Sequence, residues 1–132
     1  MKSLYISLVL FAGVIALVWI NYSCINSLID YTEKKLEAVP KFEEELNNMS
    51  VEEKEKIHDA LKAVNKKWKD SNTFLCLSLV HSVSREFIGE MIPSLSYFES
   101  GDYTQFLANI RWAKDMLSHI RYDEGLSIGN IL

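Results

Sequence analysis

The sequence predicts an all-α protein, with an N-terminal transmembrane helix that continues into an antiparallel four-helix bundle of paired helical hairpins. Three observations favour this fold class. An uncharged apolar run lies at the N-terminus, apolar residues recur at three- and four-residue spacing in the remaining chain, and there are only two Pro and five Gly. We expect two parts: a transmembrane anchor at residues 1–22 and an extracytoplasmic helical domain at residues 23–132.

Residues 4–20 form the anchor, a run of 17 residues without a charge. As a helix this run measures about 26 Å, and polar flanks can extend it across the ~30 Å hydrocarbon core. Tyr5 lies near one end, with Trp19 and Tyr22 near the other, where aromatic rings prefer headgroup depth. We therefore expect Leu4, Tyr5, Trp19 and Tyr22 to contact the lipid bilayer. A cleaved signal peptide or a lipoprotein signal is the alternative, but the run is long and no A-x-A-like site follows it.

Flanking positive charge predicts the orientation of the anchor. Lys2 and the terminal amine precede the apolar run, whereas the first cations after it, Lys34 and Lys35, follow two acidic residues. The positive-inside rule therefore favours a cytoplasmic N-terminus and an extracytoplasmic C-terminal domain. The predicted location is the cell membrane, with a single pass.

The first helix is expected to grow directly out of the membrane. No Gly or Pro occurs between Ile20 and Val39, Pro40 should kink the helix or start its last turn, and Asn47-Asn48 should end it. Its apolar stripe consists of Ile25, Leu28, Ile29, Thr32, Leu36 and Val39.

The second helix has a recognisable start. Ser50 and Glu53 form a capping box, in which each side chain bonds the other residue's backbone amide. The polar triplet at residues 70–72, Asp-Ser-Asn, is expected to end this helix. Its apolar seam consists of Ile57, Leu61, Val64 and Trp68.

Two further helices complete the predicted bundle. The third should run from Thr73 to Phe98, with a kink or interruption at Pro93. The fourth should follow residues 100–102 and end at residues 123–125, and the apolar tail at 126–132 should pack under the bundle or serve as a docking peptide. Trp68, Phe87, Phe106 and Trp112 are expected in the core, although Trp112 and Met116 fall off the main seam and could line a second face for a partner.

Five sequence features together resemble one family of small bacterial proteins. They are the opening MKSL before the membrane helix, Lys66-Lys67-Trp68, His81, the pair His119-Ile120, and the terminal Leu126-Ser127-Ile128-Gly129-Asn130-Ile131-Leu132. The chain thus resembles the domain-of-unknown-function family DUF4363 of clostridia and related Gram-positive bacteria, although Pro93 and the serine-rich stretch depart from its pattern. The resemblance implies a single-pass, surface-exposed helical protein, and it implies no established activity.

Cysteine and histidine positions suggest pairings across the hairpins. Antiparallel folding places Cys24 and Cys76 at similar height, where a disulfide is possible, and two small apolar side chains are the alternative. His81 and His119 should be neighbours on the third and fourth helices. Two imidazoles are too few for a metal site, so we expect a polar pair, no metal and no cofactor. His58 lies in a charged stretch and should be solvated.

Charge layout suggests how the domain stands. Lys62, Lys66, Lys67 and Lys69 fill one end of the second helix, which antiparallel folding turns toward the membrane. We expect a membrane-proximal basic patch, with complementation of the helix dipole as the alternative. The acidic residues at 43–45 and 52–55 fall at the far tip, as a solvated surface or a weak site for a cation or basic partner.

Composition and motifs limit the function. The chain has 132 residues, with 14 Lys+Arg against 18 Asp+Glu and a net charge of -4, so we expect no nucleic-acid partner. There is no G-x-S-x-G motif and no Gly-rich phosphate loop, so we expect no enzyme. The favoured function is a protein-interaction or scaffold module of the cell envelope that binds another envelope protein or itself. The alternative is a small-ligand or metal binder that uses the region of His81 and His119.

Overall fold

The structure is a computed structural model that describes the backbone of residues 1–74 and 78–131 and the side chains of residues 1–71 and 84–123. Within these ranges all regular secondary structure is helical. The helices are α1 (Lys2–Leu36), α2 (Glu43–Asn47), α3 (Val51–Phe74), α4 (Ser78–Ser100) and α5 (Tyr103–Ile131). The predicted all-α class is therefore confirmed for the described part of the chain.

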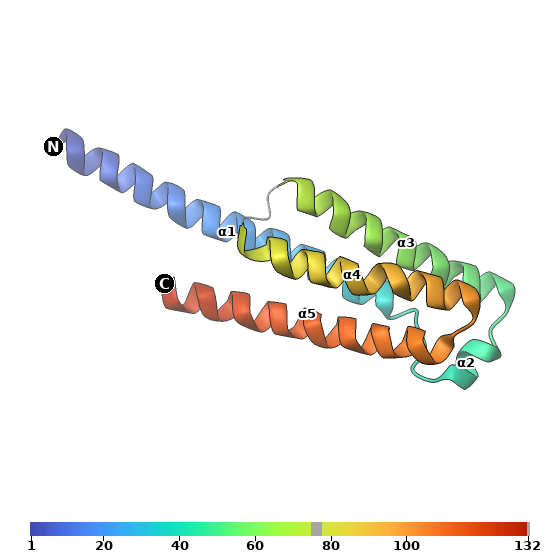
Figure 1. The fold of residues 1–132 in the computed structure, drawn as a ribbon. Coiled ribbons are helices and arrows are strands. Elements are labelled where there is room, and N and C mark those ends of the chain that lie inside the picture. The colour runs from blue at the N-terminus through green and yellow to red at the C-terminus, as the bar shows by residue number, and fades with distance from the viewer. Residues whose placement is uncertain (75–77, 132) are drawn as a thin grey trace.

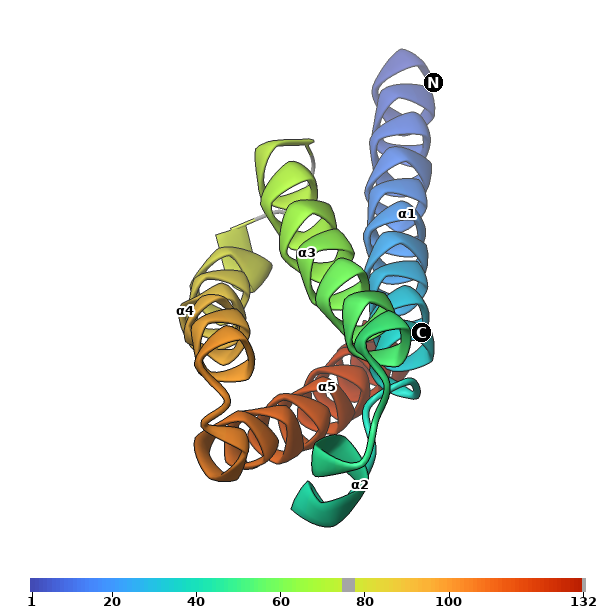
Figure 2. The same ribbon diagram turned by 90° about the vertical axis from the view of Figure 1, so that its right-hand side faces the viewer.

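The long helices contact one another in a ring. α1 contacts α3 and α5, and α4 also contacts α3 and α5, while the short α2 contacts α5. The N-terminal part of α1 projects beyond the other helices, and α2 lies at the opposite end of the molecule (Figure 1). Viewed end-on, α1, α3, α4 and α5 surround a common centre (Figure 2). The core fills this centre.

A single unbroken α1 joins two different environments. Residues 4–14 are all exposed. α1 is long and apolar enough to cross a membrane, and no residue of its most apolar segment is buried. Burial begins at Ile25 and continues at Leu28, Ile29, Thr32 and Leu36, the stripe that the sequence predicted. One helix thus carries a free apolar segment and one side of a packed core.

The predicted extent of the first helix past Pro40 is wrong. α1 ends at Leu36, and residues 43–47 form the separate helix α2. The cause lies in Pro40, because a proline disfavours the helical conformation in the residue before it. Val39 and Leu46 nevertheless stay buried, so this segment closes the end of the core.

The start of α3 is confirmed and its predicted end is wrong. The Ser50 amide donates to Glu53 Oε2 at 2.8 Å, and the Glu53 amide donates to Ser50 Oγ at 3.2 Å. The helix then runs through residues 70–72 to Phe74. Ser71 Oγ donates to the Lys67 carbonyl at 2.7 Å, a bond to the residue four positions earlier that is compatible with a helix. The polar residues 70–72 therefore do not end α3. Ile57, Leu61, Val64 and Trp68 are all buried, as predicted.

The predicted interruption at Pro93 and the predicted helix end at residues 123–125 are also wrong, whereas a kink at Pro93 stays a prediction. α4 begins at Ser78 instead of Thr73 and is continuous through Pro93, although an interior proline removes a hydrogen bond. Packing outweighs this cost, because Met91, Ser94 and Phe98 are buried on both sides of it. α5 passes through residues 123–125 and reaches Ile131, so the predicted separate tail is the end of a helix, whose side chains from residue 124 lie outside the described residues.

The turn between α4 and α5 is confirmed at its predicted place. Gly101 adopts a positive φ of 78°, a conformation that residues with a Cβ rarely adopt. The Asp102 amide donates to the Tyr97 carbonyl at 2.9 Å and the Gly101 amide to the Phe98 carbonyl at 3.2 Å, which is a Schellman motif. Asp102 Oδ1 then accepts from the Gln105 amide at 3.3 Å and caps α5.

The core contains two pairs of aromatic rings. Trp68 and Phe87 lie with ring centroids 4.1 Å apart, and Phe106 packs at 5.0 Å from Phe98. Trp112 and Met116 are partly buried and pack against this core, and the suggestion that they also line a second face for a partner stays a prediction. All four aromatic residues predicted for the core are therefore in or against it.

Candidate functional site

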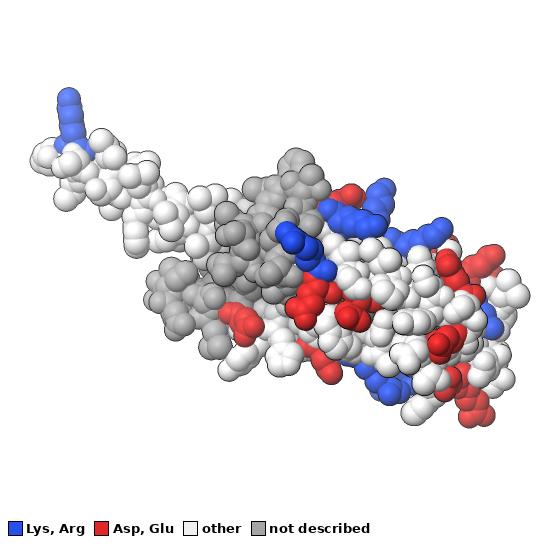
Figure 3. Space-filling model, in the orientation of Figure 1, with Lys and Arg blue, Asp and Glu red and all other residues white. Residues whose placement is uncertain are grey.

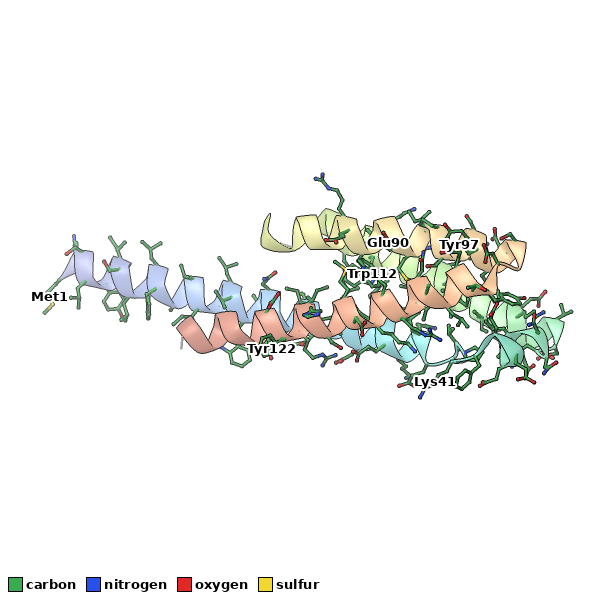
Figure 4. All side chains as sticks on the ribbon, turned by 60° about the horizontal axis from the view of Figure 1, so that its bottom comes forward. Met1, Lys41, Glu90, Tyr97, Trp112 and Tyr122 are labelled. Atoms are coloured by element: carbon green, nitrogen blue, oxygen red, sulfur yellow. The ribbon has the colours of Figure 1, made fainter. Side chains whose placement is uncertain are left out.

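The predicted anchor residues lie on the projecting part of α1. Leu4 and Tyr5 are 72% and 73% exposed, and Trp19 is 51% exposed. Trp19 and Tyr22 meet edge to face with ring centroids 6.3 Å apart, at the point where the projecting segment joins the packed helices. The space-filling view shows this segment without charge except at its tip (Figure 3), and its side chains project on all sides (Figure 4).

Farther along α1, after the projecting segment, a polar and aromatic contact joins α1 to α3. The Trp68 indole N–H donates to Thr32 Oγ1 at 2.8 Å, and Thr32 Oγ1 donates to the Leu28 carbonyl at 2.7 Å. Both side chains are buried, at 1% and 0% exposure. On the outside of the same contact, the ammonium groups of Lys35 and Lys67 lie 5.6 and 5.3 Å from the ring centroid of Tyr31. The contact sets the register of α3 along α1.

Arg121 joins α5 to the same stretch of α1. Its guanidinium Nη2 lies 2.6 Å from Asp30 Oδ1 and 3.2 Å from Glu33 Oε2. The hydrogen bond to Asp30 raises the pKa of Arg121, and the charge of Glu33 adds to the rise. The guanidinium is therefore charged at any physiological pH and holds the two helices by charge as well as by packing.

The four predicted basic residues are all exposed on α3 and lie beside two different hollows. Lys62, Lys66 and Lys69 line a hollow between α3 and α4, together with Asn65. Lys67 points to the other side of α3, over Tyr31 and against α1. Figure 3 shows blue side chains gathered along the part of the surface that α3 forms. Contact of these lysines with lipid headgroups stays a prediction.

The predicted histidine and cysteine pairs fall partly outside the described side chains. His119 is exposed on α5, whereas the His81 side chain on α4 lies outside the described residues. Cys24 is exposed on α1 and has no disulfide within the described chain, and Cys76 lies outside it. Both pairings stay predictions. Among the described residues no group of three or more His, Cys, Asp or Glu side chains could hold a metal ion.

His58 has a partner that the sequence did not reveal. Its Nε2 lies 2.7 Å from Glu99 Oε1, and the His58 side chain is 29% exposed, so this residue is only partly solvated. The pair joins α3 to α4 beside a hollow of about 260 Å³ that Val51 and Tyr103 also line. No local sequence pattern predicts this contact, because the two residues lie 41 positions apart.

Near α2, an apolar hollow opens on the surface beside α5. Pro40, Phe42 and Leu107 are among its lining residues, its volume is about 320 Å³, and Phe42 is 63% exposed. Three cationic residues complete its lining: Lys41, Arg111 and Lys114. Arg111 Nη2 donates to the Lys41 carbonyl at 3.3 Å, which fixes one side of the hollow (Figure 4 marks Lys41). The combination offers an apolar floor with a positive rim.

No protein-family model, no curated protein and no solved structure matches the chain.

Proposed function

We propose that this chain is a single-pass membrane protein whose extracytoplasmic helical domain is a non-enzymatic interaction or scaffold module of the cell envelope, of the kind that the resemblance to DUF4363 implies. The observation that supports it most is the continuity of α1. Its exposed apolar part passes into core positions within five residues, from Ile20 to Ile25. A domain attached in this way has no flexible linker, so the direction of α1 sets its orientation to the bilayer.

The contacts support the finer arrangement as an antiparallel four-helix bundle. Tyr31 of α1 meets Lys67 of α3, and four residues earlier on α1 Ser27 lines a hollow with Ser71. Later residues of α3 therefore lie beside earlier residues of α1, so the two helices run in opposite directions. The contact between Arg121 and Asp30 ties α5 into the same arrangement.

The same register supports a bundle that stands close to the membrane. α5 continues ten residues beyond Arg121, from position 121 to 131, which is about 15 Å of helix. An equal length of α1 leads from Asp30 back to Ile20, the last apolar residue of the predicted anchor. The end of α5 is then level with the bilayer surface, on the outer side if Lys2 keeps the N-terminus in the cytoplasm.

The hollow beside α2 supports the interaction role. Phe42 is exposed and lines the hollow together with the apolar residues Pro40 and Leu107. Aromatic side chains are enriched at protein–protein interfaces. The positive rim of Lys41, Arg111 and Lys114 fits an acidic amphipathic segment of another envelope protein.

In-cell crosslinking tests this proposal. A photoreactive residue would replace Lys114 at the hollow, and the matched control would replace Lys56, which is exposed on α3 and pairs with Glu52 at 3.8 Å. We expect one dominant crosslinked envelope protein from position 114 and none from position 56 in intact native cells. Self-crosslinks from position 114 alone would assign the partner as a second copy. Equal crosslinking from both positions, or none from either, would overturn the proposal.

A further inference from the structure

A second surface feature, on the far side of α3 from α1, has the character of a binding site. A hollow of about 380 Å³ opens between α3 and α4, within the range of small-ligand sites, which begin at about 300 Å³. Three of its polar residues, Lys62, Asn65 and Lys66, come from adjacent turns of one face of α3. Ile92 and Leu95 of α4 form its apolar wall.

Asn65 is the residue that distinguishes this hollow from a solvated lysine face. It is 8% exposed, and its Oδ1 has no hydrogen-bond partner among the described residues. Buried side-chain oxygens in native proteins nearly always accept a hydrogen bond, because an unpaired one costs free energy. Asn65 also lines the hollow, so a rotation of its side-chain amide would bring this oxygen to a donor group of a ligand there.

The charge of the hollow selects an anion. Lys62 and Lys66 are exposed and have no ion-pair partner within the part of the chain that the structure describes. Lys69 also lines the hollow, and Asp70 is the one acidic residue in its lining, so three positive charges face one negative charge. The two lysines Lys62 and Lys66 carry the inference without Lys69. Ammonium groups on flexible stems are common ligands of phosphate oxygens.

We propose that this hollow binds a phosphate ester whose alcohol part bears a hydroxyl group. Lys62 and Lys66 contact the phosphate oxygens, and the hydroxyl donates to Asn65 Oδ1. Ile92 and Leu95 pack against the carbon atoms of the alcohol. Glycerol phosphate has this chemistry, and it occurs both as a free compound and as the headgroup of an anionic phospholipid. The site goes beyond the proposed interaction function and does not depend on it.

The height of the hollow favours the free compound. Lys67, on the neighbouring face of α3, lies over Tyr31, and Tyr31 is eleven residues beyond Ile20. That is about 17 Å of helix, whereas the headgroup layer on each side of a bilayer is about 5–8 Å thick. An upright α1 therefore holds the hollow above the headgroups, and a lipid source needs a tilted domain.

Titration of the full chain tests the site and separates the two sources. The protein would be placed in nanodiscs of neutral phosphatidylcholine, and the side-chain amide of Asn65 would be followed by NMR while glycerol phosphate is added. We expect a saturable shift at millimolar ligand. Sulfate should bind more weakly, because it has the charge but no hydroxyl for Asn65 Oδ1, and equal binding of sulfate would contradict the role of Asn65.

Lysine variants give the matched controls. Lys62→Gln with Lys66→Gln should weaken glycerol phosphate about fivefold, since each exposed charge contributes modestly, whereas Lys56→Gln on the same helix should leave the affinity unchanged. A shift of Asn65 that occurs only when phosphatidylglycerol replaces phosphatidylcholine, and that the double variant abolishes, would keep the site and assign the lipid source. No shift from either source, or equal weakening by Lys56→Gln, would overturn the proposal.

Discussion

Replacing Thr32 with valine tests the buried contact that sets the register between α1 and α3. Valine keeps the shape of threonine and removes the hydroxyl that accepts the Trp68 indole N–H at 2.8 Å. Trp68 is 1% exposed, so its N–H has no route to water. A buried donor without a partner costs about 1–3 kcal/mol, and we expect Thr32→Val to lower the free energy of unfolding by about 2 kcal/mol.

Two companion variants separate the hydrogen bond from packing. Thr32→Ser keeps the hydroxyl and loses one methyl group, which costs about 1 kcal/mol. Trp68→Phe removes the donor itself and costs about 1–2 kcal/mol by leaving a gap beside Phe87, whose ring centroid lies 4.1 Å away. Thr32→Val should then be nearly neutral in the Trp68→Phe background, which gives a coupling energy of about 2 kcal/mol.

Urea unfolding of the full chain in neutral nanodiscs, followed by near-ultraviolet circular dichroism, measures these differences. A fall of about 2 kcal/mol corresponds to a drop in Tm of about 8 °C for a domain of this size. A Thr32→Val protein as stable as the parent, or equally destabilised with and without Trp68, would refute the reasoning that this bond joins the helices.

Three further predictions concern single contacts. Arg121→Gln should lower the free energy of unfolding by less than about 1 kcal/mol, because the group is 41% exposed; added salt should shrink the difference, and a difference independent of salt would exclude an ionic cause. The Ser50 amide, followed by the Ser50 side chain, lowers the pKa of Glu53 below its ordinary value of 4.5. The ionised Glu53 carboxylate therefore stabilises the fold above its unfolded pKa, and this stabilisation is lost as pH falls through its folded pKa. Glu53→Gln should make Tm fall less steeply at acid pH. An unchanged dependence of Tm on pH would contradict this. Gly89→Ala in α4 should stabilise by about 0.5–1 kcal/mol, since no atom lies within 4 Å of the added Cβ, whereas Gly101→Ala at φ 78° should destabilise; thermal melts that rank the two in reverse order would refute the local geometry.

The positions of the helices along the chain were predictable wherever the signal is local. The capping box at Ser50 and the glycine turn at Gly101 both lie where the sequence placed them. The apolar seams of α1 and α3 are buried residue by residue, because a three- and four-residue spacing puts such side chains on one face.

Helix ends were less predictable, because packing decides them. Pro93 and the polar residues 70–72 carry local penalties, yet α4 and α3 continue through them to keep buried residues in place. Pro40 does interrupt the helix, because it disfavours the helical conformation at the residue before it, and Val39 and Leu46 are buried even though the helix is broken between them.

The candidate sites were predictable only as residue types. The sequence grouped four lysines on one helix, but only the packing of α3 between its neighbours decides that Lys62 and Lys66 face α4 and Lys67 faces α1. Asn65 carried no signal at all, because an asparagine on a charged helix looks solvated until its burial is known. The contact of His58 with Glu99 is equally invisible in the sequence, since it joins different helices.

The central claim is that α1 crosses the membrane once, without cleavage, and holds the helical domain outside the cell. Single cysteines introduced by Ser3→Cys or Asp115→Cys, in a background where Cys24 and Cys76 are serine, would be exposed to a membrane-impermeant thiol reagent on intact cells. The account predicts that the cysteine at position 115 reacts in intact cells and the cysteine at position 3 only after permeabilisation, both in full-length membrane-bound protein. Reaction in the reverse order, or recovery of position 115 in a released protein that lacks its first residues, would contradict it.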